Sequence, residues 1–432
     1  MKTTKIAILG FGTVGSGVYT VLQQNSELIR HRQLLDLSVK RVLVRDLLHG
    51  RNLALAPMET FTTDYADILA DGEISIVVEC IGGVNPAKDY ILRALQAGKT
   101  VVTANKEVLS KHWPDLERAA KETGAGLYFE ASVGGGIPII RALNDSMQAN
   151  NISRVMGIIN GTTNYILTKM TNEGRAYEEV LKEAQALGYA EADPSADVDG
   201  WDCVYKLSIL ASIAFHARVN IENIYREGIS KVSAEDIAAA KELGYTIKLL
   251  AIGKKQDEKL LEVRVHPTML PNSHPLSSVS GPFNAIFLTG NAVDDIMLYG
   301  RGAGMLPTAS AVVSDVIVAA KTAKGAHPYM TFNNEFDAPQ WLKNQKDWTS
   351  SYFLRMEVDD ELGVLSKIAG VFAEYGVSVH SLMQKNENKA NGSAELIFIT
   401  DTARELSVQN ALCALRALPC VREIKSVMRV EE

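Results

Sequence analysis

The sequence is poor in cysteine, and its few cysteines are scattered. Cys80, Cys203, Cys413 and Cys420 form no CxxC pair and no spacing typical of a metal site, so neither a disulfide framework nor a zinc motif is indicated. Long apolar runs are also lacking. The longest, at residues 207–215 and 309–320, have the length of a core helix, and Asp315 interrupts the second. The sequence therefore predicts no membrane span.

An excess of positive charge is missing too. The formal net charge is -7, which argues against nucleic acid or an anionic membrane as a partner. The opening MKTTKIAILG runs straight into a strand pattern and shows no signal-peptide core before a cleavage site. With 432 residues, 47% of them hydrophobic and 22% charged, we expect a cytoplasmic, reduced protein of two or three globular domains.

A glycine-rich turn follows the first predicted strand. Residues 5–9 are apolar, Gly10, Gly12 and Gly15 then form a GxGxxG pattern, and a helical stretch runs from Ser16 to about residue 29. In a dinucleotide-binding turn the first glycine permits the bend, the second admits the pyrophosphate and the third lets the helix pack on the strand. A bare GxGxxG is weak evidence, but this position in an α/β pattern predicts a dinucleotide site.

The end of the second predicted strand, residues 37–44, suggests which cofactor is bound. An acidic residue there would bind the ribose hydroxyls of NAD, whereas an arginine suits the 2′-phosphate of NADP. Arg45 occupies the position and favours NADPH. Asp46 follows directly, so NADH remains possible.

Later strand ends carry further candidate ligand-binding residues. Lys106 follows a predicted strand at residues 100–103, and ligands of open parallel sheets bind at such carboxyl ends. A solvated loop lysine is the alternative. The three glycines at 134–136 leave backbone groups available for a ligand or an ion. The polar turn at 160–164 could bind a small polar substrate, but by itself a cap for a helix starting at Tyr165 is the simpler interpretation.

Residues 188–206, GYAEADPSADVDGWDCVYK, gather acidic residues ahead of a lysine in an apolar stretch. From Trp201 the pattern predicts a buried helix on which Asp202 and Lys206 lie one turn apart. An ordinary surface pair is one interpretation, but the residues that follow are nearly all apolar, and burying such a pair is costly. A calcium-binding loop of the EF-hand type is excluded as well. Such a loop needs a glutamate at its twelfth position, and Lys206 occupies that position here.

The order of elements predicts an α/β chain with three domains. They are a Rossmann-type dinucleotide-binding domain at 1–135, completed by residues 302–325; an α+β catalytic and dimerisation domain with a mixed or antiparallel sheet at 136–301; and, after a linker at 326–350, a ferredoxin-like βαββαβ domain at 351–430.

Several motifs together resemble the homoserine dehydrogenase family, in its long single-function form with a C-terminal ACT domain. They are GFGTVGSG near the start, VVTANKE (101–107), YFEASVGGGIPI (128–139), IINGTTNYILTKM (158–170), EAQALGYAEADPSADVDGWD (183–202) and GRGAGMLPTASAVVSD (300–315). The segment DELGVL (360–365) matches the start of the first ACT helix. The resemblance covers nearly the whole chain and is far more specific than a dinucleotide fingerprint.

The resemblance implies an activity and a set of site residues. Such enzymes interconvert aspartate 4-semialdehyde and homoserine with a nicotinamide cofactor, on the route to threonine, isoleucine and methionine. Glu191 and Asp202 would bind the amino-acid end of the substrate, Lys206 would donate the proton, and Lys106 would orient the substrate or assist. The implied cofactor-binding residues are Gly10, Phe11, Gly12, Thr13, Val14, Gly15, Arg45, Lys106, Gly188 and Gly304. A sodium-type cation would be held by Glu130 and the carbonyls of Val133, Gly135 and Ile137.

The chemistry of the reaction agrees with these residue types. Hydride delivery to an aldehyde carbon builds negative charge on the oxygen, which an ammonium both stabilises and protonates. Asp202 would help to keep Lys206 charged, and the α-ammonium of the substrate calls for carboxylates. The cation, with oxygen ligands alone, is expected to fix the 130–137 loop rather than to take part in hydride transfer.

The ACT segment leaves its role open. The resemblance implies that an amino acid, such as threonine, binds near Gly363 and lowers activity, in a homodimer or homotetramer. A domain that only dimerises, or that has lost its ligand, is the alternative, because the fold alone does not establish a ligand.

Two rival functions fit the sequence less well. Aspartate-semialdehyde dehydrogenase shares the cofactor fold but needs a thiolate at a helix start, whereas Cys203 lies in an apolar helix and Cys80 at a strand end. A non-catalytic regulator would leave Lys206, Glu191 and Asp202 without a role.

Overall fold

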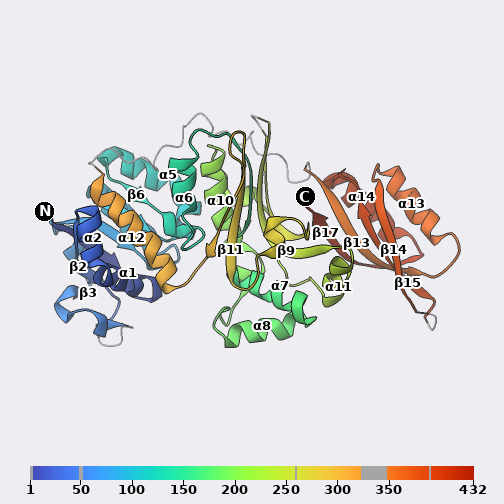
Figure 1. Cartoon of the computed structure of the whole chain (residues 1–432), viewed down its shortest axis with the longest axis horizontal. Coiled ribbons are helices and arrows are strands. Elements are labelled where there is room, and N and C mark those ends of the chain that lie inside the picture. The colour runs from blue at the N-terminus through green and yellow to red at the C-terminus, as the bar shows by residue number, and fades with distance from the viewer. Residues whose placement is uncertain (1–2, 48–51, 258–259, 323–347, 389–390) are drawn as a thin grey trace. The chain divides into compact units, whose positions relative to one another are not determined.

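A parallel sheet organises the N-terminal part of the chain (Figure 1). In the computed structural model, which describes residues 3–47, 52–257, 260–322, 348–388 and 391–432, six parallel strands pair in the order β3-β2-β1-β4-β5-β6. This is the order of a Rossmann-type dinucleotide-binding domain, as predicted. The strands are β1 (Thr3–Leu9), β2 (Asp36–Leu43), β3 (Phe61–Thr62), β4 (Ile74–Glu79), β5 (Thr100–Thr103) and β6 (Leu127–Tyr128).

Internal contacts divide the chain into two units, each built from segments distant in sequence. The first comprises Met1–Gly161, Val204–Glu222 and Phe283–Ala338; the second comprises Thr162–Cys203, Asn223–Pro282 and Pro339–Glu432. Of the predicted linker at 326–350, residues 326–347 lie outside the described residues.

The core of the first unit lies between the parallel sheet and its helices. Ile8 of β1 is fully buried, as expected for a parallel strand covered on both faces. Helices α1 (Thr13–Gln24) and α12 (Met305–Lys321) lie side by side (Figure 1, blue and orange). They approach so closely that a Cβ atom on Gly17 would lie 2.8 Å from the carbonyl oxygen of Met305. Helix α12, which follows the glycines at 300, 302 and 304, therefore packs into the same core as β1.

Three antiparallel strands complete the first unit. The central strand, β11 (Phe283–Gly290), pairs with β7 (Ile152–Ile158) and with β12 (Asp294–Arg301). Side chains along β12 alternate between exposed and half-buried, and Met297 and Tyr299 are exposed. Among the described strands, β12 is the last in the order of its sheet.

The second unit begins with helices and two long antiparallel strands. β10 pairs with β9 along its length, and it also pairs in parallel with the short strand β8 and with the last strand of the chain. The elements are α7 (Gly161–Glu173), α8 (Tyr177–Ala186), α9 (Ser195–Val198), β8 (Tyr225–Arg226), α11 (Ala234–Glu242), β9 (Tyr245–Asp257) and β10 (Leu260–Pro271).

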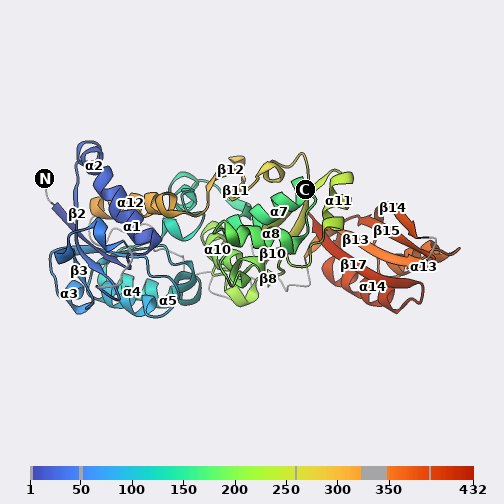
Figure 2. The same ribbon diagram turned by 90° about the horizontal axis from the view of Figure 1, so that it is seen from below.

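The C-terminal part of this unit has the predicted βαββαβ order. Its antiparallel strands follow the order β17-β13-β15-β14, and α13 and α14 cover the same face of the sheet (Figure 2). The elements are β13 (Thr349–Asp359), α13 (Val364–Glu374), β14 (Val379–Asn388), β15 (Ser393–Thr400), α14 (Glu405–Ala417) and β17 (Val421–Val430).

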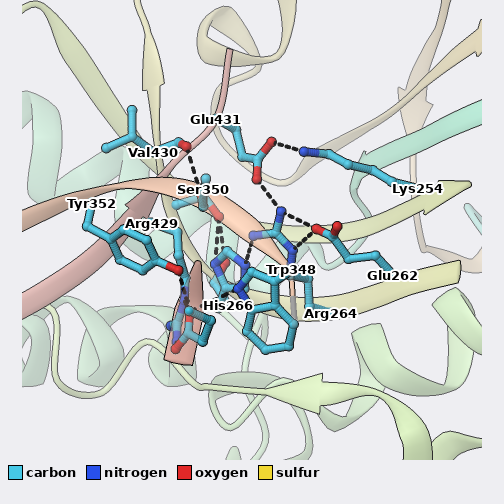
Figure 3. A network of polar contacts seen from close by, with 12 residues as sticks. Lys254, Glu262, Arg264, His266, Trp348, Ser350, Tyr352, Arg429, Val430 and Glu431 are labelled. Carbon is cyan, nitrogen blue, oxygen red and sulfur yellow. Dashed lines mark hydrogen bonds and ion pairs between the residues drawn. The ribbon is translucent and has the colours of Figure 1, made fainter. Parts of the chain in front are cut away.

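Buried charged side chains join this C-terminal fold to β10 (Figure 3). Arg264 of β10 is fully buried and pairs with Glu262, at 2.6 Å, and with Glu431. Arg429 of β17 pairs with Glu405, the first residue of α14, at 2.7 Å. Charges removed from water are tolerated only when they are paired in this way. The pair between Arg264 and Glu431, the residue after β17, therefore connects the C-terminal fold to β10.

Two predicted helices have different boundaries in the structure, and the first begins at Thr13 instead of Ser16. The helix predicted from Ser16 to residue 29 is broken at Asn25 into α1 and α2 (Ser26–Gln33). Helix α7 begins at Gly161 instead of Tyr165, so most of the polar turn forms its first helical turn and does not cap a later helix. No helix within the described residues combines the length and hydropathy of a membrane span.

Candidate active site

The glycine turn after β1 has the geometry that a dinucleotide requires. Gly10 has φ 87°, and a Cβ atom on Gly15 would lie 2.0 Å from the Gly10 carbonyl oxygen, so both positions require glycine. A Cβ atom on Gly12 would meet nothing within 4 Å, so open space lies beside it. Gly12 caps α1, and amides such as those of Thr13 and Val14 are available for a phosphate because a first helical turn leaves them unpaired.

A cleft of about 680 Å³ opens beside this turn. Residues 10–12 line it together with Arg45 and Asp46 after β2 and residues 80–82 after β4. Its volume lies within the usual range for small-molecule sites, and Arg45 is exposed. The cleft therefore fits a dinucleotide, with a basic side chain available for a phosphate.

Phe11 can offer this cleft only its backbone. Its ring is buried against Tyr19 and Phe61, with ring centroids 5.8 and 5.3 Å apart and edge-to-face geometry. The side chain thus anchors the glycine turn in the core.

Glu79, a buried carboxylate that no motif in the sequence indicated, connects two strand ends near the cleft. Its Oε1 accepts the Ile81 N–H at 2.7 Å, and its Oε2 accepts the Thr103 hydroxyl at 2.6 Å. Thr103 Oγ1 accepts the Asn105 N–H at 3.0 Å, and the Asn105 side chain donates to the Gly83 carbonyl at 2.7 Å. Burial raises the pKa of Glu79, and these donors act in the opposite direction. The network links the turn after β4 to the turn that precedes Lys106.

Lys106 is half-buried and begins α5 (Lys106–Thr123) at the carboxyl end of β5, where the sequence placed it. Further along α5, the Lys111 ammonium lies 5.1 Å from the centre of the Tyr205 ring. Tyr205 is on α10 (Trp201–Ala214), directly before the predicted proton donor. The two helices that carry the candidate lysines therefore touch.

Lys206 is buried, with 7% of its surface exposed, and its ammonium donates to the Ile159 carbonyl at 2.7 Å. Ile159 follows β7 and precedes the polar turn at 160–164. Asp202 is also buried and lies in the first turn of α10, where the helix dipole favours negative charge. One face of one helix thus carries the predicted proton donor and a predicted substrate carboxylate.

Gly188 has a local structural role that the sequence analysis did not foresee. It follows the end of α8 with φ 76°, and its N–H donates to the Gln185 carbonyl at 3.1 Å. The Tyr189 N–H donates to the Ala184 carbonyl at 2.8 Å, which completes a Schellman motif. Ending a helix accounts for this glycine, and its contact with the cofactor stays a prediction.

The loop that carries Glu191 is tied to the start of α7. Glu191 is exposed, and the Gln185 side chain donates to its carbonyl oxygen at 3.1 Å. The Thr162 hydroxyl donates to the Tyr189 carbonyl at 2.7 Å. The polar turn therefore helps to shape the loop of the predicted substrate carboxylate.

Glu130, the predicted cation ligand, belongs to a buried polar cluster. Its carboxylate accepts the N–H groups of Ile140 and Arg141, both at 2.8 Å, and its own N–H donates to Asp315 at 2.8 Å. The Arg141 guanidinium pairs with Asp315 at 3.0 Å. Burial raises the pKa of Glu130, and it raises that of Asp315 to about 7.

The other predicted cation ligands are backbone carbonyls. Among the described residues no group of three or more His, Cys, Asp and Glu side chains could hold a metal ion, so a cation here would depend on Glu130 and carbonyls such as that of Ile137. The Ile137 carbonyl accepts the Ile139 N–H at 2.8 Å. A carbonyl or carboxylate oxygen keeps a further lone pair after one such bond. The donor set therefore fits a hard cation.

Neither Cys80 nor Cys203 suits the role of a thiolate nucleophile, which the rival aspartate-semialdehyde dehydrogenase would need. Burial raises the pKa of Cys80 well above its ordinary value, as does the neighbouring Glu79, and Cys203 is fully buried within α10. A nucleophilic cysteine needs the opposite, a stabilised and accessible thiolate.

Comparison with known proteins identifies the family. The family model "Homoserine dehydrogenase" matches residues 138–317, its NAD binding domain model matches 10–130, and the ACT domain model matches 352–420. Homoserine dehydrogenase of Bacillus subtilis is 44% identical over 434 residues, which span 100% of this chain and 99% of the relative. The chain belongs to the homoserine dehydrogenase family. It is thus an oxidoreductase that acts on a CH–OH group with NAD(P), and the predicted family is confirmed.

Solved homoserine dehydrogenases share the fold. The enzyme of Thiobacillus denitrificans, 39% identical, superposes with a TM-score of 0.92 and is matched over 100% of this chain and 99% of its own. A hyperthermophilic archaeal homoserine dehydrogenase, solved in complex with NADPH, is 29% identical with a TM-score of 0.63, over 75% of this chain and 99% of its own.

Proposed function

We propose that the chain reduces aspartate 4-semialdehyde to L-homoserine with NADPH, on the route to threonine, methionine and isoleucine. The observation that carries the proposal is the buried ammonium of Lys206 at the end of β7, one helical turn from the buried Asp202. The archaeal relative in complex with NADPH and the position of Arg45 at the cleft support the cofactor. Turnover of aspartate 4-semialdehyde by the purified chain tests the reaction.

Each candidate side chain then has a chemical task. When bound, a nicotinamide cofactor supplies the hydride. Lys206 stabilises the negative charge that develops on the aldehyde oxygen and transfers a proton to it, giving the hydroxyl of the product. Glu191 and Asp202 bind the α-ammonium of the substrate, and this fixes which end of the molecule faces Lys206. Lys106, held at the end of β5, orients the substrate.

The cofactor preference is assigned to Arg45. Replacement of Arg45 by alanine should raise the KM for NADPH about tenfold or more, because a charge-assisted bond to the 2′-phosphate is lost. The KM for NADH should change by less than about twofold, since NADH lacks that phosphate. Steady-state kinetics with both cofactors, and Arg32→Ala on the exposed surface of α2 as a control, measure the difference. Equal changes for the two cofactors would contradict the assignment.

We further propose that a monovalent cation such as sodium binds Glu130 and the carbonyls of Val133, Gly135 and Ile137. It would hold the 130–137 loop and take no part in proton or hydride transfer. Gly134 and Gly135 of this loop both have positive φ, at 71° and 53°, so the backbone turns sharply there. Glu130 brings the negative charge that a cation requires.

Sodium should therefore stabilise the free protein. In sodium chloride the unfolding midpoint should exceed that in choline chloride of equal ionic strength by a few degrees, because an ion that binds only the folded state stabilises it. Glu130→Gln should lower the midpoint in both salts and abolish the difference between them. An identical midpoint for the wild type in the two salts would argue against the site.

The ACT domain is proposed to bind an amino-acid effector, such as threonine, near Gly363. Gly363 precedes α13 with φ 86°, and the adjacent Leu362 is fully exposed, so this loop is open to a ligand. The position corresponds to the loop between the first strand and first helix of the domain.

Assembly and domain boundaries are also part of the proposal. We infer a homodimer or homotetramer in the cytoplasm, with β12 as a contact, because its exposed edge carries Met297 and Tyr299 and unpaired strand edges favour association. The proposed domains keep the boundaries expected from the sequence: 1–135 with 302–325, 136–301 and 351–430.

A further inference from the structure

Arg429, on the last strand of the ACT domain, has side-chain partners outside that domain. Arg429 is buried, with 2% of its surface exposed (Figure 3). Its Nη1 pairs with Glu227 at 2.8 Å, and its Nη2 donates to the Tyr225 hydroxyl at 2.9 Å. The guanidinium carbon also lies 4.8 Å from the centre of the Tyr225 ring. Both partners belong to the segment 225–229, which begins with β8 and is called here the β8 segment.

The β8 segment contacts the turn that leads into α10. Arg226 donates to the Asp199 carbonyl, and its guanidinium lies 4.2 Å from the centre of the Trp201 ring. The Ile229 N–H donates to the Val198 carbonyl at 2.9 Å. Trp201 is the first residue of α10, and the candidate substrate carboxylate follows it.

The geometry of the β8 segment leaves it little freedom. The Glu227 N–H donates to the Val265 carbonyl of β10 at 2.8 Å, so its backbone is held by the sheet. A Cβ atom on Gly228 would lie 2.4 Å from the Val198 carbonyl oxygen, so the segment and the turn are in direct backbone contact. Neighbouring side chains of an extended segment point to opposite sides, which lets Glu227 face Arg429 while Arg226 faces the turn.

We propose that Arg429 of the ACT domain is a positioning residue for the substrate site. It fixes the β8 segment through Glu227, and the β8 segment fixes the turn at 198–200 and thereby the first turn of α10, which carries Asp202. This inference rests on the proposed role of Asp202 in substrate binding. The ACT domain then supports catalysis even when no effector is bound.

Arg429 also has a partner in the interior of the ACT domain. Its second carboxylate partner, Glu405, also accepts the Trp348 indole N–H at 2.9 Å and the Tyr352 hydroxyl at 2.6 Å. Glu405 is the first residue of α14, so the guanidinium bridges the start of an ACT helix and the β8 segment. A displacement of α14 would thus alter the position of the Arg429 guanidinium, which pairs with Glu227.

Steady-state kinetics of the full chain test the proposal with three single variants and one double variant. Glu227→Gln removes the charge that Arg429 binds, and Arg226→Met removes the contacts of the Arg226 side chain with Asp199 and Trp201. Both should raise the KM for homoserine about tenfold, the usual effect of losing one charge-assisted bond. The KM for the cofactor should stay within about twofold, because the glycine turn and its cleft are made by other residues. Arg429→Met should give the same pattern, and combining it with Glu227→Gln should add little to the KM change, since both variants remove the pair between Arg429 and Glu227.

The controls separate positioning from general damage. Arg422→Met also breaks an arginine–carboxylate pair on β17, with Asp359 at 2.7 Å, but within the ACT domain, and it should leave both KM values unchanged. Should Arg429→Met fail to fold, Glu227→Gln tests the same bond at a partner whose side chain is 40% exposed. An unchanged KM for homoserine in both Glu227→Gln and Arg226→Met, while Asp202→Asn raises it, overturns the inference and leaves the proposed function intact. An unchanged KM in Asp202→Asn as well overturns the substrate role and the inference with it.

Discussion

Replacement of Lys206 by methionine should lower kcat for aldehyde reduction about a thousandfold. Methionine keeps most of the side-chain length but has no proton to give and no charge for the developing alkoxide, and positioned general acids commonly contribute that much. Lys206 is buried, and its ammonium donates to the Ile159 carbonyl. A solvent-exposed lysine therefore cannot take over its role as proton donor. Affinity for NADPH, measured by fluorescence titration, should change by less than about twofold. The glycine turn proposed to bind the cofactor lies at the start of α1, whereas Lys206 lies on α10.

A matched variant makes this result interpretable. Lys182→Met removes an exposed lysine from α8 and should leave kcat unchanged. If Lys206→Met retained more than about a tenth of the wild-type kcat, Lys206 would not be the general acid. Lys106, the other candidate lysine, would then be examined in the same assay.

Loss of Arg264 should destabilise the fold more than any other charge substitution considered. Arg264 is fully buried and pairs with Glu262 and Glu431, and its Nη1 lies 3.0 Å from His266 Nε2 (Figure 3). Arg264→Met leaves the buried Glu262 without its arginine and leaves Glu431 with Lys254 as its cation. Breaking comparable buried pairs costs about 3–5 kcal/mol. Chemical denaturation followed by circular dichroism measures the free energy of unfolding.

An exposed pair on the neighbouring strand provides the comparison. Arg422 and Asp359 form a partly exposed ion pair, so Arg422→Met should cost about 1 kcal/mol or less. Equal costs for Arg264→Met and Arg422→Met would show that the buried network contributes no special stability. A large cost for Arg264→Met alone would support the view that the ACT fold is fixed to β10 by these charges.

The parts of the structure set by local sequence were predicted well. The strand, glycine turn and helix at residues 3–24 have the predicted order. Glycine is required at positions 10 and 15 by the backbone geometry of a few neighbouring residues, which a local motif records. The alternating pattern of the last segment likewise predicted the βαββαβ fold, since each of its elements has a clear period. The break at Asn25 was missed because no proline or glycine marks it.

The contacts that the sequence did not reveal are those between distant residues. Arg264 and Glu431 are separated by 167 positions, and Glu79 meets Thr103 only because β4 and β5 are neighbours in the sheet. Charged residues within apolar strand patterns, such as Arg264 in LLEVRVHPTML, were the available signal that a buried partner exists. The partner itself becomes visible only in three dimensions.

The residues at 188–206 illustrate the same limit within one motif. Periodicity placed Asp202 and Lys206 on one face of a buried helix, and the structure agrees. Gly188, by contrast, ends α8 in a Schellman motif, a role that depends on where that helix stops. Nor did the sequence suggest that the turn before α10 is held by Arg226, which follows it by more than twenty positions.

The reaction proposed for this chain converts aspartate 4-semialdehyde to homoserine with a nicotinamide cofactor. The most direct test incubates the purified full chain with NADPH and aspartate 4-semialdehyde, and follows NADPH oxidation while the product is identified by mass spectrometry. We expect NADPH to be consumed in equal amount to the homoserine formed, and no NADPH to be consumed without the aldehyde. Absence of homoserine under these conditions, from a protein shown to be folded, would contradict it.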